Sequence, residues 1–97
     1  MRRGTTPTFV FSLPIHRDMI AGISVSMVQD GKELLTVGQG DITLGVRTAT
    51  FSLSVEQTLL FKPGIAELQL TVYDVLGEVL ISDVRSVAVR KKLPEDA

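Results

Sequence analysis

The chain has 97 residues, with 10 Lys and Arg against 11 Asp and Glu, 44% hydrophobic residues and no cysteine. This length is enough for one domain with its own core and too short for two. The charge balance gives no overall attraction to nucleic acid or an anionic membrane. The missing cysteines exclude disulfides, thiolate chemistry and cysteine-ligated zinc.

No apolar run reaches the roughly 18–20 residues that span a bilayer. The residues after Arg2 and Arg3 also lack the apolar stretch of a signal peptide. We therefore expect a soluble protein made in the cytoplasm, with residues 1–97 forming a single domain.

Alternating apolar and polar residues predict short β-strands along most of the chain. The alternation is clearest at Phe9, Phe11 and Leu13 and again from Ala66 to Val72. Pro14 ends the first strand, because proline cannot donate a ladder hydrogen bond. The predicted strands are Thr8–Leu13, Ile23–Val28, Leu34–Val37, Asp41–Leu44, Thr48–Leu53, Ala66–Val72 and Glu78–Val89.

The connections between these strands carry turn and cap signals. Asp30-Gly31 and Asp74-Val75-Leu76-Gly77 predict tight turns. Ile15–Ala21 is expected to hold one irregular helical turn. Ser54-Val55-Glu56-Gln57 has capping-box spacing, so one short helical turn is predicted near residues 55–60. Leu59, Leu60 or Phe61 would then close one end of the core.

About seven short strands at regular spacing predict an all-β, antiparallel, immunoglobulin-like sandwich. A small closed barrel is the competing architecture. Residues 1–7 are predicted to form an extended arm, and residues 91–97 a solvated tail.

The last strand poses a register problem. Val79, Ile81, Val87 and Val89 share one parity, which predicts that they face the core, but Asp83 and Arg85 share it too. Burying an unpaired charge is costly. We expect either a bulge near Ser82-Asp83 that turns Val84 inward, or an Asp83–Arg85 pair at a sheet edge.

Residue types that carry chemistry occur without a recognisable pattern. His16 is the one histidine, and its loop position after Pro14 is typical of a solvated side chain. No serine lies in a nucleophile elbow, and the acidic residues lack the spacing of a calcium loop. Gly38-Gln39-Gly40-Asp41 lacks the helix start of a phosphate loop. We therefore predict no enzymatic activity, no cofactor and no metal.

Two features predict contact with other proteins. Arg2 and Arg3 could join the basic residues 90–92 in a small positive patch, without the aromatic platform that nucleic acid needs. Several strands also carry apolar residues on both faces, so the outward-facing ones are expected to be covered by a copy of the chain or by a partner. The candidate interface residues are Arg2, Arg3, Val10, Leu35 and Leu80.

Several segments together carry a resemblance to known proteins: Met1–Phe9, Gly31-Lys32-Glu33, Leu53–Leu59 and Gly77–Asp83. Through these segments nearly the whole chain resembles a family of small proteins encoded in phages and prophages of Gram-positive bacteria, often among virion structural genes. The strand order also resembles the immunoglobulin-like N-terminal domain of phage baseplate upper proteins, although no coiled coil or fibre domain follows it here.

This resemblance implies a non-enzymatic phage structural or accessory protein, such as a tail or baseplate adaptor. Its partners would be other phage structural proteins or copies of itself, without nucleic acid or membrane. It would be found in the virion, and in the host cytoplasm during assembly. The alternative is a small phage-encoded inhibitor that binds a host protein.

Overall fold

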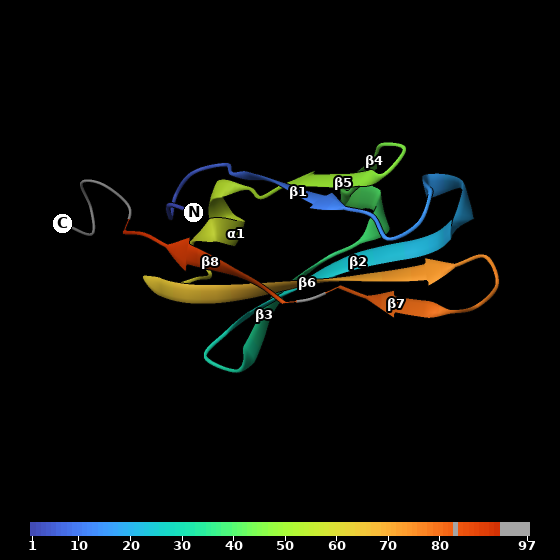
Figure 1. Cartoon of the computed structure of the whole chain (residues 1–97). Coiled ribbons are helices and arrows are strands. Elements are labelled where there is room, and N and C mark those ends of the chain that lie inside the picture. Colours follow the sequence, from blue (N-terminus) through green and yellow to red (C-terminus); the bar gives the residue numbers. More distant parts are fainter. Residues whose placement is uncertain (83, 92–97) are drawn as a thin grey trace.

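The computed structural model describes residues 1–82 and 84–91 and contains two antiparallel sheets that face each other (Figure 1). The smaller sheet has the order β1-β5-β4, and the larger has the order β3-β2-β6-β7, with β8 also paired to β6. The elements are β1 (Thr8–Ser12), β2 (Ile20–Gln29), β3 (Lys32–Val37), β4 (Thr43–Leu44), β5 (Thr48–Ser52), α1 (Val55–Thr58), β6 (Gly64–Asp74), β7 (Val79–Ile81) and β8 (Arg85–Val89), with 3₁₀ turns at Arg17–Met19 and Gln39–Asp41.

This strand order is that of an immunoglobulin-like sandwich. Such folds place strands B, E and D in one sheet and C′, C, F and G in the other. Here β1, β5 and β4 correspond to B, E and D, and β3, β2, β6 and the pair β7/β8 correspond to C′, C, F and G. The predicted all-β sandwich is confirmed, and the closed-barrel alternative fails because the described strands form two separate sheets.

The core lies between the inward faces of the two sheets. From Ile23 to Gln29 in β2 and from Ala66 to Val72 in β6 every second residue is buried, as the alternation in the sequence predicted. Phe51 of β5 stacks on Phe9 and Phe11 of β1, with ring centroids 5.4 and 6.1 Å apart. These aromatic pairs add specific contacts to the apolar area that drives the sheets together.

One end of the core is closed by α1 and the residue that follows its last turn. Ser54 accepts from the Gln57 backbone N at 3.1 Å, and Gln57 Oε1 accepts from the Ser54 backbone N at 2.8 Å. The predicted capping box is therefore confirmed. Phe61 is 1% exposed and fills the end of the core, whereas Leu59 and Leu60 are exposed.

The N-terminal residues lie against the last strand and α1. The Arg3 backbone N donates to Arg90 O at 3.1 Å, and Arg2 bridges Arg90 in parallel. The Gly4 backbone N donates to Oγ1 of buried Thr58 at 2.9 Å. That hydroxyl in turn donates to Val55 O at 2.8 Å, so Thr58 connects α1 to the N-terminal segment.

Thr58→Val should lower the free energy of unfolding by about 1–2 kcal/mol, because it keeps the shape of the side chain but leaves the Gly4 N–H without its acceptor. Chemical denaturation measures the loss, and amide exchange should quicken at residues 2–4. Thr43→Val, at an exposed strand position, is the matched control. Equal stability of the two variants would contradict this role.

The last predicted strand, Glu78–Val89, is split into β7 and β8 by a change of register, as predicted. Thr71 pairs with Ile81 in β7, whereas Leu68 pairs with Arg85 in β8, so one extra residue lies between the two strands. The predicted orientation was right for Val87 and Val89 in β8, which face the core, and wrong for β7 and Val84. Leu80 packs against the core, while Val79, Ile81 and Val84 are exposed.

The physical reason is that β7 and β8 present opposite parities to the core. Leu80 lies opposite buried Val72, and Val87 lies opposite buried Ala66. Apolar residues on both faces of β7 left the alternation uninformative there. The alternative of an Asp83–Arg85 pair involves a position outside the described residues, as does the predicted tail from residue 92 onward.

Arg85 lies at the open side between the two sheets. Its guanidinium carbon lies 5.4 Å from the ring centroid of Phe11 and 5.9 Å from that of Phe9, and its Nη1 donates to Val10 O at 2.9 Å. A cation over aromatic faces is favourable. The charge that seemed awkward in the sequence therefore covers the core edge without being buried.

The helices of the described residues are all too short to cross a membrane.

Candidate interaction surface

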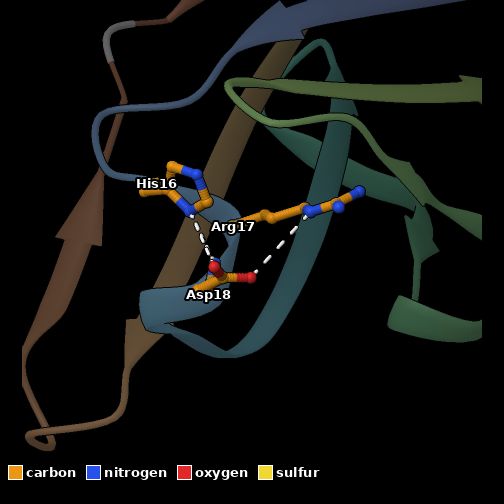
Figure 2. A network of polar contacts seen from close by, with 3 residues as sticks. All are labelled: His16, Arg17 and Asp18. Atoms are coloured by element: carbon orange, nitrogen blue, oxygen red, sulfur yellow. Dashed lines mark hydrogen bonds and ion pairs between the residues drawn. The ribbon is translucent and has the colours of Figure 1, made fainter.

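The lone histidine lies in a local turn, and Figure 2 shows its contacts. His16 precedes the 3₁₀ turn Arg17–Met19, and its Nδ1 accepts from the Asp18 backbone N at 3.1 Å. Arg17 Nε lies 3.9 Å from Asp18 Oδ1, an exposed pair that contributes little stability. The three side chains therefore shape the connection between β1 and β2. Within residues 1–82 and 84–91, no three His, Asp or Glu side chains gather as a metal-binding group.

The structure places the two predicted basic contact residues at the N-terminal end of the sandwich. Arg2 is exposed, and its Nη1 donates to Lys91 O at 2.8 Å. Arg3 is half-buried, and its backbone pairs with that of Arg90. The termini thus lie together, and a contact role for these arginines stays a prediction.

The three predicted apolar contact residues do not form one surface. Val10 is exposed on the outer face of β1. Leu35 pairs with buried Met27 and packs against the core, and Leu80 does the same from β7. The expectation that Leu35 and Leu80 point outward was therefore wrong, because their cross-strand partners are core residues.

Three connections meet at the end of the sandwich away from the N-terminus (Figure 1), and each carries exposed apolar residues. We call the four exposed apolar residues on these connections, Met19, Val46, Val75 and Leu76, the loop end. They come from the 3₁₀ turn, the β4–β5 turn and the β6–β7 hairpin, and Leu76 is the most exposed of them at 77%.

Backbone hydrogen bonds hold the three connections of the loop end to one another. The Val75 N–H donates to Met19 O at 2.9 Å, and the Arg17 N–H donates to Val46 O at 3.0 Å. Within the hairpin, Asp74 Oδ1 accepts from the backbone N of both Leu76 and Glu78, at 2.9 and 2.8 Å. A surface held in this way loses little conformational entropy when it binds.

Sequence reasoning missed the loop end because it treated these residues as turns. The signal was present in the hairpin, where Val75 and Leu76 occupy turn positions that usually hold polar residues. The other two members, Met19 and Val46, are ordinary single apolar residues in loops. Only the strand order brings all of them to one end.

The opposite end of the molecule carries a charged hollow of about 430 Å³. Exposed Leu59 and Leu60 line it together with Arg3, Lys32 and Lys62. Lys62 is paired with Asp30 at 2.5 Å. Charged residues are depleted at the centres of protein interfaces, so the loop end is the better candidate for a contact surface.

No protein family and no curated protein matches the chain in sequence. Among solved structures, the V domain of amphioxus IgVJ-C2 is similar in fold, with 13% sequence identity and a TM-score of 0.39. The match covers 92% of this chain and 96% of that domain.

Proposed function

We propose that this chain is a non-enzymatic phage structural or accessory protein, a tail or baseplate adaptor that acts through protein–protein contacts. The observation that carries the contact role is the loop end, where exposed apolar side chains sit on connections held together by hydrogen bonds. The phage assignment is supported by the sequence resemblance of Met1–Phe9 and Gly77–Asp83 to small phage and prophage proteins.

Leaving the apolar side chains of the loop end in water costs free energy. Burying one large aliphatic side chain completely is worth roughly 1.5–3 kcal/mol, and Leu76 is almost fully exposed. Grouped apolar residues on a monomer surface commonly mark a site where another protein binds. A partner would bury Leu76 at the centre and leave polar groups such as Asp18 and Glu78 at the rim.

Leu76→Asp should reduce the yield of infectious particles by about tenfold or more, since it puts a charge at the centre of the contact. Leu60→Asp is the matched control, because Leu60 is an exposed leucine at the opposite end of the molecule. Both purified variants should unfold at the temperature of the wild type. Mass spectrometry of purified virions should find the chain in repeated copies.

Absence of the chain from virions would overturn the proposal, as would normal particles from phage carrying Leu76→Asp. Co-purification of the chain with one host protein, together with its absence from virions, would instead support the alternative of a small inhibitor that binds a host protein.

A further inference from the structure

The larger sheet has one edge without the protection that β-proteins normally provide. Free edges usually carry charges or prolines, or are covered by another segment. The edge strand β3 begins with Lys32 and Glu33, and β8 is covered by the N-terminal segment through Arg3 N to Arg90 O and Arg90 N to Met1 O. The strand β7 is Val-Leu-Ile, without charge or proline, and among the described strands it pairs with β6 alone.

The backbone of β7 is oriented to accept another strand. Asp74 N donates to Glu78 O, and Ser82 N donates to Leu70 O, so the even-numbered residues of this segment bond to β6. In an antiparallel ladder the hydrogen-bonding groups of successive residues point to opposite sides. The N–H and C=O groups of Val79 and Ile81 therefore point away from β6, toward the free edge.

The outer face beside this edge is apolar and uncharged. Val79 lies beside Tyr73, its cross-strand partner on β6, and Ile81 lies beside Thr71. Val84 shares this face, where it lines a small hollow together with Gln69 and Ser26. Tyr73, Val79, Ile81 and Val84 are all exposed, and we call these four residues the β7 face.

Pairing a second strand with this edge leaves the β7 face on the outer surface of the joined sheet. If the second strand is β7 of another copy, Val79 and Ile81 of each copy become cross-strand neighbours, and apolar cross-strand pairs stabilise antiparallel sheets.

We propose that β7 pairs with β7 of a second copy of this chain, antiparallel about a twofold axis beside Leu80. In this register Val79 of each copy lies opposite Ile81 of the other, and each such pair exchanges both of its free backbone hydrogen bonds. Glu78 falls opposite Ser82, so the Glu78 carboxylates of the two copies do not face each other. The contact is self-complementary and closed, as a twofold interface requires.

The inner side of the same edge fits this arrangement. A groove of about 370 Å³ lies between the end of β1 and β7, lined by Leu13, Pro14 and Leu80 among others. Pairing about the twofold axis puts Leu80 of the second copy on the inner side, beside the mouth of this groove. The inner side of the paired edge is therefore apolar in both copies.

Sedimentation equilibrium of the full chain from micromolar to millimolar concentration tests the proposal. The wild type should be a dimer. Ile81→Lys should raise the dissociation constant of the dimer by at least about tenfold, because each dimer would then hold two lysines at the joined edge. Ile81→Pro should do the same by removing an N–H that β6 does not use. Ile65→Lys, at an exposed outer-face position near the other end of β6, should leave the dimer intact.

Hydrogen exchange on the wild type gives a readout that does not depend on any variant folding. The amides of Val79 and Ile81 should exchange more slowly as the concentration rises, while the amide of Ile65 should not change. A monomer up to millimolar concentration would overturn the proposal, as would equal dimerisation of the Ile81→Lys and Ile65→Lys variants.

This inference deepens the proposed function by naming one partner, and the two can fail separately. A monomeric chain found in virions would refute the dimer and leave the phage role standing. A dimeric chain missing from virions would refute the phage role and leave the β7 interface standing.

Discussion

Replacing Phe61 with alanine should lower the free energy of unfolding by about 3–5 kcal/mol, the range typical of large aromatic truncations in cores. Phe61 is among the largest fully buried side chains, and it closes the end of the core beyond α1. Its backbone N donates to Thr58 O at 3.3 Å, which fixes the position of the ring relative to the helical turn. The surrounding strands cannot collapse into the gap, because β2 and β6 are held by their ladders to neighbouring strands.

Urea denaturation followed by circular dichroism measures the loss for Phe61→Ala. Leu60→Ala is the control, since the neighbouring side chain is 54% exposed and its truncation should cost less than about 1 kcal/mol. Similar losses for the two variants would show that Phe61 does not close the core. A loss large enough to unfold the protein at room temperature would agree with the marginal stability of small domains.

Replacing Gln29 with methionine should cost about 2–3 kcal/mol, because the substitution preserves volume and removes two hydrogen bonds. Gln29 is 5% exposed and ends β2. Its Nε2 donates to Lys62 O at 2.7 Å, and its Oε1 accepts from Lys62 N at 2.9 Å. The amide thus satisfies both backbone groups of a residue in the segment between α1 and β6.

Thermal and chemical denaturation of Gln29→Met should show this loss, with faster amide exchange at residues 61–64. Gln39→Met is the matched control, because Gln39 is exposed in the 3₁₀ turn after β3. If both glutamine variants were as stable as the wild type, the Gln29–Lys62 pair would contribute nothing measurable to the fold.

The candidate surfaces were only partly accessible to sequence reasoning. Val10 is flanked by two core phenylalanines of its own strand, so its outward orientation followed from the alternation alone. Leu80 has apolar neighbours on both sides, and the alternation could not choose which of them faces the core. Its orientation depends on the pairing with Val72 across the hairpin. Val79, Ile81 and Val84 were therefore expected in the core, although they lie on the outside.

Several features of this protein were determined by local sequence. Gly77 with a φ of 88° and Asp74 with its side-chain hydrogen bonds make the β6–β7 turn from neighbouring residues. The capping box at Ser54 likewise needs only residues within one helical turn. The alternation in β2 and β6 specifies which face is buried, because one face is apolar from Ile23 to Met27 and from Ala66 to Val72.

Three other features were decided by the tertiary structure alone, because they depend on contacts between segments that lie far apart in the sequence. The loop end exists because strand order brings residues 19, 46 and 76 together. Arg85 is accommodated because β1 passes close enough for Phe9, Phe11 and Val10 O to receive its guanidinium. The change of register between β7 and β8 follows from pairing with β6, and the paired residues are 6 to 25 positions apart along the chain. Local patterning holds no information about such pairings, because their free energy comes from area buried and hydrogen bonds made across the fold.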